Sequence, residues 1–232
     1  MAEKHDYKAL GFKAGLEIHA QLDGKKLFCE CPTCIREDEP DYEVTRKLKA
    51  VTGETGETDL AAKQEQRKDK SYVYQGYNDT TCLVELDDEP PHLMNQGALN
   101  LTLQMCKFLH CKIVDEVQVM RKTVVDGSNT SGFQRTSLVG FDGYIEVNGK
   151  KVSIESICLE EDACKNVSRS PAKDVYNLSR LGIPLIEIAT GPDMNTPEEV
   201  RLVAEKLGML LRSLAAHKGQ SIKRGLGTIR QD

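Results

Sequence analysis

The sequence of 232 residues contains no apolar run of 18 or more residues, the length that would predict a membrane-spanning helix. Its N-terminus carries Glu3, Lys4 and Asp6 and lacks the pattern of a secretory signal peptide. The net charge is −5, so no overall basic character predicts nucleic-acid binding, and any such surface must be local. These absences predict a cytoplasmic protein with no membrane contact.

The residues that are present suit a folded domain. Hydrophobic residues make up 39% and charged residues 29% of the chain, whose length is enough to bury a sizeable core. The periodicity predicts several strands, one hairpin and two long helices. This content is that of an α+β fold.

Two predicted strands carry a carboxylate inside an otherwise apolar run. Apolar and polar positions alternate over residues 9–22, which places Glu17 and His19 on one face, two residues apart. At that spacing two side chains of one strand can meet one ligand. A second strand, over residues 181–189, carries Glu187. A solvent-facing Glu/His pair is the more common outcome of such a pattern.

Three consecutive acids, Glu160, Glu161 and Asp162, follow a third apolar run. Strand alternation places Glu160 and Asp162 on one face and Glu161 on the other. If the strand ends in a cleft, these acids suit Mg²⁺, which prefers oxygen ligands. A solvated strand end is the simpler interpretation of the triplet alone, and the two other carboxylate-bearing strands favour the metal.

A β-hairpin is predicted over residues 138–159, because Asn148-Gly149 lies between two alternating runs. The two open ends of a hairpin lie together. The segment 126–135, which precedes the hairpin, and the acids that follow it should therefore be neighbours.

The segment 126–135 is rich in glycine, serine and threonine, and cations flank it at Arg121, Lys122 and Arg135. Free backbone amides, hydroxyl donors and cations suit a polyphosphate. The segment does not match the P-loop pattern and precedes a strand, so a long hairpin connection is the alternative.

The remaining sequence predicts further helices and strands. Helices are predicted at residues 41–50, 59–70 and 95–110, and from the capping box at Thr196 onward. Strands are predicted at residues 72–87 and 113–125. The polar stretch 23–72 looks least like core and is expected to leave the main sheet.

Eight cysteines in a cytoplasmic chain are interpreted as thiols or metal ligands before disulfides. Cys29, Cys31 and Cys34 have a spacing that zinc sites use, and Cys82 is the nearest candidate for a fourth ligand. The spacing alone favours a loop with no metal and no redox role.

Several separated motifs resemble the B/E subunit family of tRNA-dependent amidotransferases, at residues 15–19, 26–29, 159–163, 182–188 and 192–193. The segments 126–135 and 223–232 resemble the archaeal E branch of this family in particular. The similarity extends over essentially the whole chain.

The resemblance implies that residues 1–232 are the N-terminal part of a catalytic cradle domain. Such a cradle resembles the glutamine synthetase/guanido kinase fold, with a curved antiparallel sheet and helices on one side. The resemblance further implies an inserted synthetase-like domain and a helical tail in the full-length family member. We expect residues 1–232 to be a fragment without them, and to lack amidation activity by itself.

The activity that the resemblance implies is ATP- and Mg²⁺-dependent phosphorylation of the γ-carboxylate of Glu-tRNA(Gln), followed by amidation with ammonia to give Gln-tRNA(Gln). The implied partners are Glu-tRNA(Gln) and an asparaginase-like D subunit that supplies the ammonia. A heterotetramer of two D and two E subunits is the implied assembly.

Phosphoryl transfer depends mostly on positioning and on neutralising charge. By matching strand positions, the resemblance assigns Mg²⁺ to Glu17, His19, Glu161 and Glu187, with Glu160 and Asp162 in support. The candidates for contact with ATP phosphates are Arg121, Lys122, Arg135, Ser128, Asn129, Ser131 and Gly132.

Two other interpretations remain open at this point. One is a metal-dependent carboxylate phosphotransferase that acts on a small molecule, which the lack of a visible tRNA-binding stripe permits. The other is a scaffold without catalysis that docks tRNA and a partner chain. Loss of ATP hydrolysis in Glu161→Gln without unfolding is the outcome that both enzyme interpretations predict.

Overall fold

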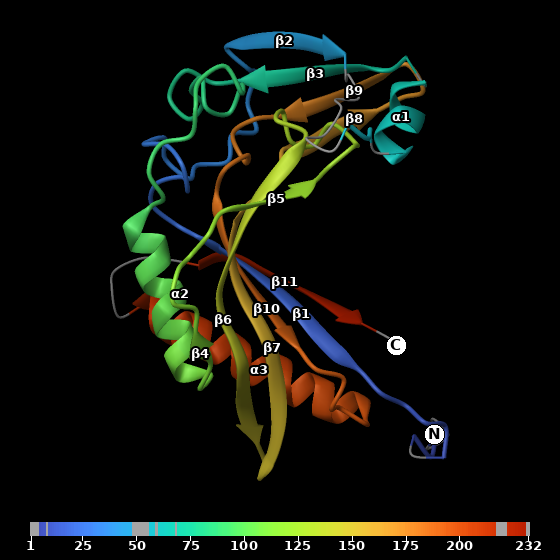
Figure 1. The fold of residues 1–232 in the computed structure, drawn as a ribbon, viewed down its shortest axis with the longest axis vertical. Coiled ribbons are helices and arrows are strands. Elements are labelled where there is room, and N and C mark those ends of the chain that lie inside the picture. The colour runs from blue at the N-terminus through green and yellow to red at the C-terminus, as the bar shows by residue number, and fades with distance from the viewer. Residues whose placement is uncertain are drawn as a thin grey trace.

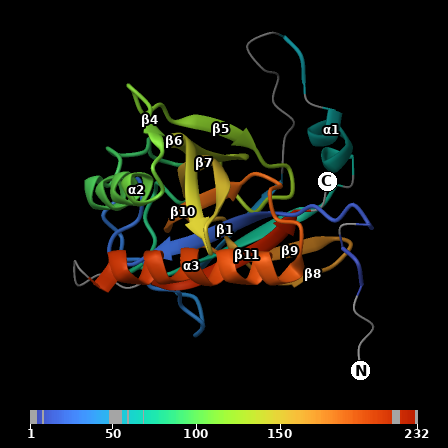
Figure 2. The same ribbon diagram turned by 90° about the horizontal axis from the view of Figure 1, so that it is seen from below.

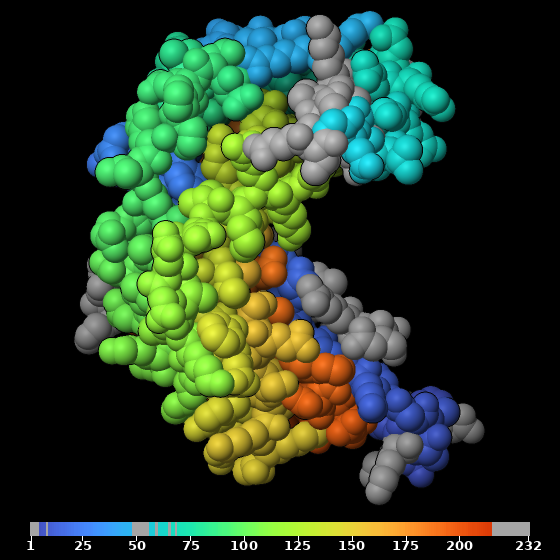
Figure 3. Space-filling view, in the orientation of Figure 1, coloured from blue at the N-terminus to red at the C-terminus, as the bar shows by residue number. Residues whose placement is uncertain are grey.

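The computed structural model describes residues 5–7, 9–47, 56–58, 60–67, 69–216 and 222–230. In this part of the chain two β-sheets and three helices form an α+β fold (Figure 1). The outline is concave (Figure 3), and the smaller sheet lies at one end of the long strands of the larger sheet (Figure 1). None of the described helices combines the length and the apolarity needed to cross a membrane.

The larger sheet is antiparallel throughout. Its strand order is β11 (Ile222–Arg230), β1 (Gly15–Leu22), β10 (Pro184–Thr190), β7 (Lys150–Glu161), β6 (Phe133–Val147) and β4 (Lys112–Ile113), with β5 (Met120–Thr123) also paired to β6.

The helices α2 (Gln96–Phe108) and α3 (Pro197–Ala216) pack on one face of this sheet (Figure 2). The alternation in β1 explains which face: Leu16 and Ile18 enter the core that the two helices cover. The side chain of Asn95 caps α2 by accepting a hydrogen bond from the Ala98 amide at 3.2 Å. The hydroxyl of Thr196 caps α3 in the same way, so both predicted long helices are confirmed.

The hairpin β6–β7 is confirmed, with its turn at the predicted residues. Asn148 and Gly149 have φ angles of 50° and 78°, the left-handed conformations that a two-residue hairpin turn requires. As predicted, the ends of this hairpin bring segment 126–135 beside the acids: the Ser128 carbonyl accepts from the Cys164 amide, and the Gln134 side chain donates to the Glu161 carbonyl.

The smaller sheet has the order β2 (Tyr42–Lys47), β3 (Ser71–Gly76), β9 (Lys173–Asn177) and β8 (Lys165–Arg169), and β3 pairs with β9 in parallel. Its own core contains Tyr72, Tyr74 and Tyr176, and the ring centre of Tyr176 lies 6.4 Å from that of Tyr72 and 6.0 Å from that of Tyr74. The polar stretch therefore leaves the main sheet, as predicted, and the helix α1 (Leu60–Gln66) lies within the predicted span 59–70.

Three local predictions are wrong. Residues 42–47 form strand β2 instead of a helix, because pairing with β3 satisfies their backbone while alternate side chains stay exposed. Residues 80–87 form turns after β3 instead of continuing a strand. Residues 113–125 contain only the short strands β4 and β5, separated by an exposed connection.

Candidate functional site

A group of ionisable side chains lies on the face of the larger sheet that α2 and α3 do not cover. Glu17 and His19 alternate along β1 with core residues, and Glu187 of β10 is the strand partner of His19. The His19 Nε2 atom lies 2.9 Å from Glu187 Oε2 and 3.7 Å from Glu17 Oε1. One donor atom from each of the three side chains falls within 4.8 Å of the others, so these residues can hold one metal ion. We call them the carboxylate–histidine cluster.

Glu160 at the end of β7 extends this cluster. Its Oε1 atom lies 3.6 Å from His19 Nε2, and its Oε2 atom accepts a hydrogen bond from the Thr136 hydroxyl at 3.1 Å. Burial, and then the charge of Glu187, raise the pKa of Glu160. The hydrogen bond to Glu187 raises the pKa of His19, and burial opposes this shift. The local excess of negative charge would be relieved by a proton or a cation.

The structure places Glu161 apart from the other residues of the expected metal set. Alternation turns its side chain away from His19, where both carboxylate oxygens accept hydrogen bonds from Arg135 at 3.1–3.2 Å. Both side chains are at least nine-tenths buried. Glu160, which the sequence placed only in support, occupies the position beside His19 instead.

Arg135 is likewise not available to a phosphate in this arrangement. Besides its ion pair with Glu161, its guanidinium lies 5.7 Å from the ring centre of Phe28 and 5.3 Å from that of Phe133. The guanidinium of Arg121 also lies 5.3 Å from the ring centre of Phe133. Arg135 lines a small cavity of about 10 Å³, whereas Lys122 lines a much larger one.

This cavity has a volume of about 350 Å³ and adjoins the carboxylate–histidine cluster through His19 and Glu160. Its wall brings together residues from β1, β5, β7 and the segments around them. The lining residues are His19, Gln21, Lys122, Val124, Ser128, Asn129, Gln134, Glu160, Asp162, Ala163, Arg180 and Leu185.

The loop expected to bind phosphates divides into two parts. Ser128 and Asn129 line the cavity, as a ligand-binding loop would require. Ser131 instead donates its hydroxyl to the Phe133 carbonyl, and the Gly132 amide donates to the Asn129 carbonyl. The second half of the loop therefore stabilises its own turn.

Gln21 and Arg180 are polar residues of the cavity wall to which the sequence assigned no role. Gln21 donates a hydrogen bond to Asp162, and its position two residues after His19 on the same strand face was the signal that could have identified it. Arg180 lies 3.6 Å from Asp162 and donates to the carbonyls of Ala163 and Cys164. No spacing in the sequence connects Arg180 to this site.

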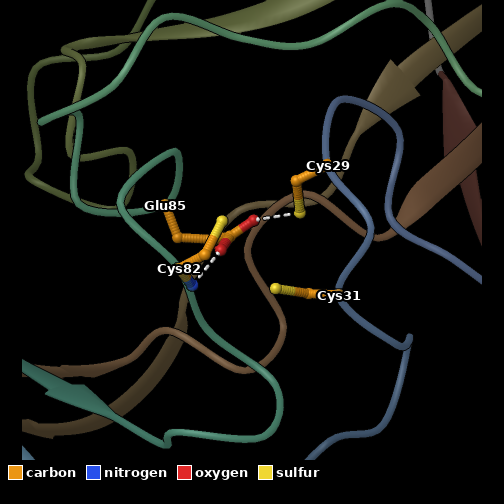
Figure 4. A group of neighbouring side chains, drawn as sticks. All are labelled: Cys29, Cys31, Cys82 and Glu85. Carbon is orange, nitrogen blue, oxygen red and sulfur yellow. Dashed lines mark hydrogen bonds between the residues drawn. The ribbon is translucent and has the colours of Figure 1, made fainter.

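A second group of side chains that could bind a metal ion lies in loops: Cys29, Cys31, Cys82 and Glu85 (Figure 4). One donor atom from each lies within 4.8 Å of the others, and we call this group the cysteine cluster. Cys29 donates to Glu85 Oε1 at 2.9 Å, and the Cys82 amide donates to Glu85 Oε2 at 2.7 Å. The neighbouring Cys29, with which its ionisation is linked, lowers the pKa of Cys31 to about 7.

The cysteine cluster confirms that three of the four candidate cysteines lie together. The fourth, Cys34, is exposed and outside the group, and the buried carboxylate of Glu85 stands in its place. Glu85 has a further neighbour in the buried Lys26, whose Nζ atom lies 3.7 Å from it.

Comparison with known proteins shows which protein family the chain resembles. The model of the GatB/GatE catalytic domain matches residues 12–232. The E subunit of glutamyl-tRNA(Gln) amidotransferase from Archaeoglobus fulgidus is 54% identical over 229 residues, covering 98% of this chain and 36% of the relative. The proteins of the same name from Methanocaldococcus jannaschii and Methanosarcina acetivorans are each 52% identical, over 98% and 99% of this chain.

The chain spans about a third of the length of these relatives, 35–36% in each case. The range that the family model matches includes both clusters and the cavity. The chain therefore belongs to the GatB/GatE catalytic domain family.

Proposed function

We propose that this chain is the ATP- and Mg²⁺-dependent part of a glutamyl-tRNA(Gln) amidotransferase. The reaction would phosphorylate the γ-carboxylate of Glu-tRNA(Gln), and ammonia would then displace the phosphate to give Gln-tRNA(Gln). The names of the archaeal relatives support this reaction class. The antiparallel sheet with helices on one face is compatible with the cradle fold expected from the resemblance.

The observation that carries the proposal is the carboxylate–histidine cluster at the wall of the 350 Å³ cavity. Binding sites for small molecules are typically cavities of about 300–1,000 Å³ with a few convergent polar groups. Here anionic donors stand beside the cations Lys122 and Arg180. A nucleotide complexed with a divalent cation presents the complementary charges.

The donor types of this cluster fit Mg²⁺. Glu17 and Glu187 supply carboxylate oxygens, Glu160 adds a third at 3.6 Å from His19, and His19 supplies a nitrogen when it is neutral. A bound cation would lower the raised pKa values of His19 and Glu160, because it favours their deprotonated forms. A bound Mg²⁺ would neutralise the charge of the transferred phosphoryl group.

The chain's own residues would then bind and orient the reactants. Lys122 and Arg180 would neutralise phosphate oxygens, and they take over the role expected of Arg121 and Arg135. The hydrogen bond from Gln21 and the proximity of Arg180 orient Asp162 at the cavity wall. Positioning of this kind supplies much of the acceleration in phosphoryl transfer.

The partners also remain part of the proposal. An asparaginase-like D subunit and Glu-tRNA(Gln) are expected to complete the enzyme, in a heterotetramer of two D and two E subunits. The relatives are named as subunits, which supports an assembly of more than one chain type. A cytoplasmic location is proposed on the same basis.

Thermal unfolding with Mg²⁺ and ATP tests the proposed site. A ligand at 100 times its dissociation constant, bound only by the folded state, stabilises by about 2.7 kcal/mol. We expect this shift in the wild type and its loss in the Glu17→Gln/Glu187→Gln double variant. Glu155→Gln, which changes a carboxylate of β7 outside the cavity wall, is the matched control and should shift like the wild type.

Absence of a shift in the wild type would contradict the proposal and favour the scaffold interpretation. If ATP binds and is hydrolysed at a rate independent of added Glu-tRNA(Gln), the small-molecule phosphotransferase is the better assignment. Stimulation by Glu-tRNA(Gln) but not by uncharged tRNA would support the amidotransferase.

We further propose that the cysteine cluster binds zinc as a structural ion. Three thiols and one carboxylate within 4.8 Å make a four-donor set, which structural zinc sites use in tetrahedral geometry. The lowered pKa of Cys31 favours the thiolate that a metal requires, whereas burial raises the pKa of Cys82 to about 11, so a bound metal would have to displace that proton. The clustering favours zinc over the inert loop that the spacing alone had favoured.

Elemental analysis of the purified protein tests this second role. One zinc per chain is expected in the wild type and much less than one in Cys31→Ser. Cys34→Ser is the control, because Cys34 lies outside the cluster, and it should keep the metal. Equal zinc content in all three proteins would contradict the assignment.

A further inference from the structure

The loop 126–132 is fixed from one side by the tyrosines of the smaller sheet. The Tyr74 hydroxyl donates to the Gly127 carbonyl at 2.8 Å, and the Tyr176 hydroxyl donates to the Asp126 carbonyl at 2.7 Å. Gly127 has a φ of +81°, and a Cβ there would lie 2.3 Å from the ring of Tyr72. Only glycine satisfies both the conformation and the close contact.

The same loop is fixed from its other side. The Thr130 hydroxyl donates to the Glu85 carbonyl at 2.7 Å, and the Ser128 carbonyl accepts from the Cys164 amide at 2.8 Å. Asn129 lies between these two anchored residues. Its backbone is therefore held in place on both sides, which limits how far its side chain can move.

The side chain of Asn129 has no hydrogen-bond partner for either Nδ2 or Oδ1 among the described residues. The residue is 1% exposed, so bulk water does not satisfy these atoms either. Buried amides in folded proteins are nearly always paired, and an exception calls for an explanation. Because Asn129 belongs to the wall of the 350 Å³ cavity, a ligand can supply the partner.

A second orphaned atom lies in the same wall. Gln21 Oε1 is buried and unpaired among the described residues, whereas the Gln21 nitrogen donates to Asp162. The wall also contains the apolar side chains of Val124 and Leu185. Unpaired amide groups beside apolar side chains suit a planar group that carries donors and acceptors on its edge.

We propose that Asn129 reads the edge of the adenine base of ATP, with Oδ1 accepting from the exocyclic amino group and Nδ2 donating to a ring nitrogen. An asparagine side chain presents a donor and an acceptor at the spacing of that edge. This inference rests on the proposed binding of ATP in the cavity. It changes the expected role of Asn129 from phosphate contact to base recognition.

The charge distribution supports a base at Asn129. The cations of the wall, Lys122 and Arg180, are the groups that suit phosphates, whereas an amide carries no net charge to attract them. Gln21 Oε1 supplies a further acceptor for a hydroxyl or amino donor of the same ligand. Ring and phosphates thus have separate partners in one wall.

Equilibrium titrations with ATP and with tripolyphosphate, both in Mg²⁺, separate base recognition from phosphate recognition. We expect Asn129→Leu to weaken ATP binding by about tenfold or more, the usual effect of losing a bidentate base contact. Tripolyphosphate binding should stay within about twofold of the wild type, because it has no base. The ligand-free variant should melt no lower than the wild type, since its amide has no partner to lose.

Thr80→Val is the matched control, because it removes another unpaired buried polar atom that does not line the cavity. It should leave both affinities unchanged. If the leucine variant does not fold, Asn129→Ala removes both amide groups without adding a charge and should weaken ATP binding alone in the same way.

Equal weakening of ATP and tripolyphosphate by Asn129→Leu would overturn the inference in favour of a phosphate contact. An unchanged affinity for ATP would overturn it as well. Wild-type protein that binds tripolyphosphate and ATP equally well would refute base recognition and leave the phosphate site standing. Wild-type protein that binds neither would instead refute the proposed function itself.

Discussion

The two donor clusters differ in ligand chemistry, in burial and in the elements that carry them. The carboxylate–histidine cluster lies on the strands β1 and β10 of an antiparallel sheet, and His19 retains 24% exposure of its side chain. The cysteine cluster is built on irregular segments, and Cys29 and Glu85 are buried. One cluster borders a cavity of about 350 Å³ on a rigid surface, and the other joins two loops to each other.

On the proposed assignments, the carboxylate–histidine cluster must exchange its ligands during the reaction, whereas the cysteine cluster would keep its metal. Oxygen and nitrogen donors on a rigid sheet can bind and release a hard cation while the fold stays intact. The cysteine cluster is carried by loops, so the zinc proposed there would contribute directly to folding. Substitutions in the two clusters should therefore have opposite consequences for stability and for ligand binding.

Cys82→Ser is expected to have the largest effect on stability. Loss of a structural zinc ion should lower the free energy of unfolding by on the order of 5 kcal/mol or more, because zinc binding supplies folding energy. Glu187→Gln, by contrast, should change the free energy of unfolding by less than about 1 kcal/mol. Urea unfolding of the two variants measures this difference. Equal loss of stability in the two variants would contradict the distinction between the clusters.

Substitutions of the neighbouring acids Glu160 and Glu161 should also differ in their effects on stability and on Mg²⁺ binding. Glu161→Gln leaves the buried Arg135 without its ion-pair partner and should destabilise the fold by about 3–5 kcal/mol. Glu160→Gln removes a carboxylate whose pKa is raised by burial and by Glu187, so stability should be kept while Mg²⁺ affinity falls. Chemical denaturation and Mg²⁺ titration of both variants test this prediction.

A reversed result for these two variants, with Glu161→Gln stable and deficient in Mg²⁺ binding, would restore the metal set expected from the resemblance. Glu146→Gln, an exposed carboxylate of β6, serves as the control for both measurements.

Binding of Mg²⁺ to the carboxylate–histidine cluster should weaken at low pH. His19 must be neutral to act as a ligand, and its hydrogen bond to Glu187 raises its pKa. Below that raised pKa, affinity should fall by up to about tenfold per pH unit, or about 1.36 kcal/mol. Mg²⁺ titrations at several values between about pH 5 and 8, where histidine titrates, measure this pH dependence of the affinity. In His19→Gln the affinity should vary less with pH.

The metal-free protein should respond to pH in the opposite direction. The folded-state pKa of His19 is raised, so the protonated pair with Glu187 stabilises the fold fully below the unfolded value of about 6.5. This contribution is lost as pH rises through the folded-state pKa. Urea unfolding of the metal-free wild type and of His19→Gln across this pH range measures the contribution of His19. If the difference in free energy of unfolding between them did not change with pH, the pairing of His19 with Glu187 would be refuted.

The smallest expected effect concerns the loop that connects the two clusters. Thr130 contacts Glu85 of the cysteine cluster, and Ser128 lines the cavity beside His19. Tyr74→Phe removes one hydrogen bond to this loop and should cost about 1 kcal/mol of stability. Thermal unfolding measures the change, and Tyr7→Phe, in the N-terminal segment, is the control. An effect as large as that of Cys82→Ser would mean that this tyrosine does more than hold the loop.

Much of the larger sheet could be predicted from local patterns. The β6–β7 hairpin, both long helices and the shared face of Glu17 and His19 depend on periodicity and on capping or turn residues, which neighbours in sequence specify. Strand β2 could not be predicted, because its pairing with β3 overrides its local preference. The parallel pairing of β3 with β9 joins segments that are distant in sequence, such as Val73 and Val175, and has no local signal.

The site divides in the same way. The sequence by itself determined that Glu160 and Asp162 share a face and that Glu161 does not, because side chains alternate along a strand. Only the tertiary structure decided which face meets His19, that Arg135 neutralises Glu161, and that Glu85 instead of Cys34 joins the cysteines. Those outcomes depend on the register between strands and on loop packing, where contacts distant in sequence compete and local periodicity carries no information.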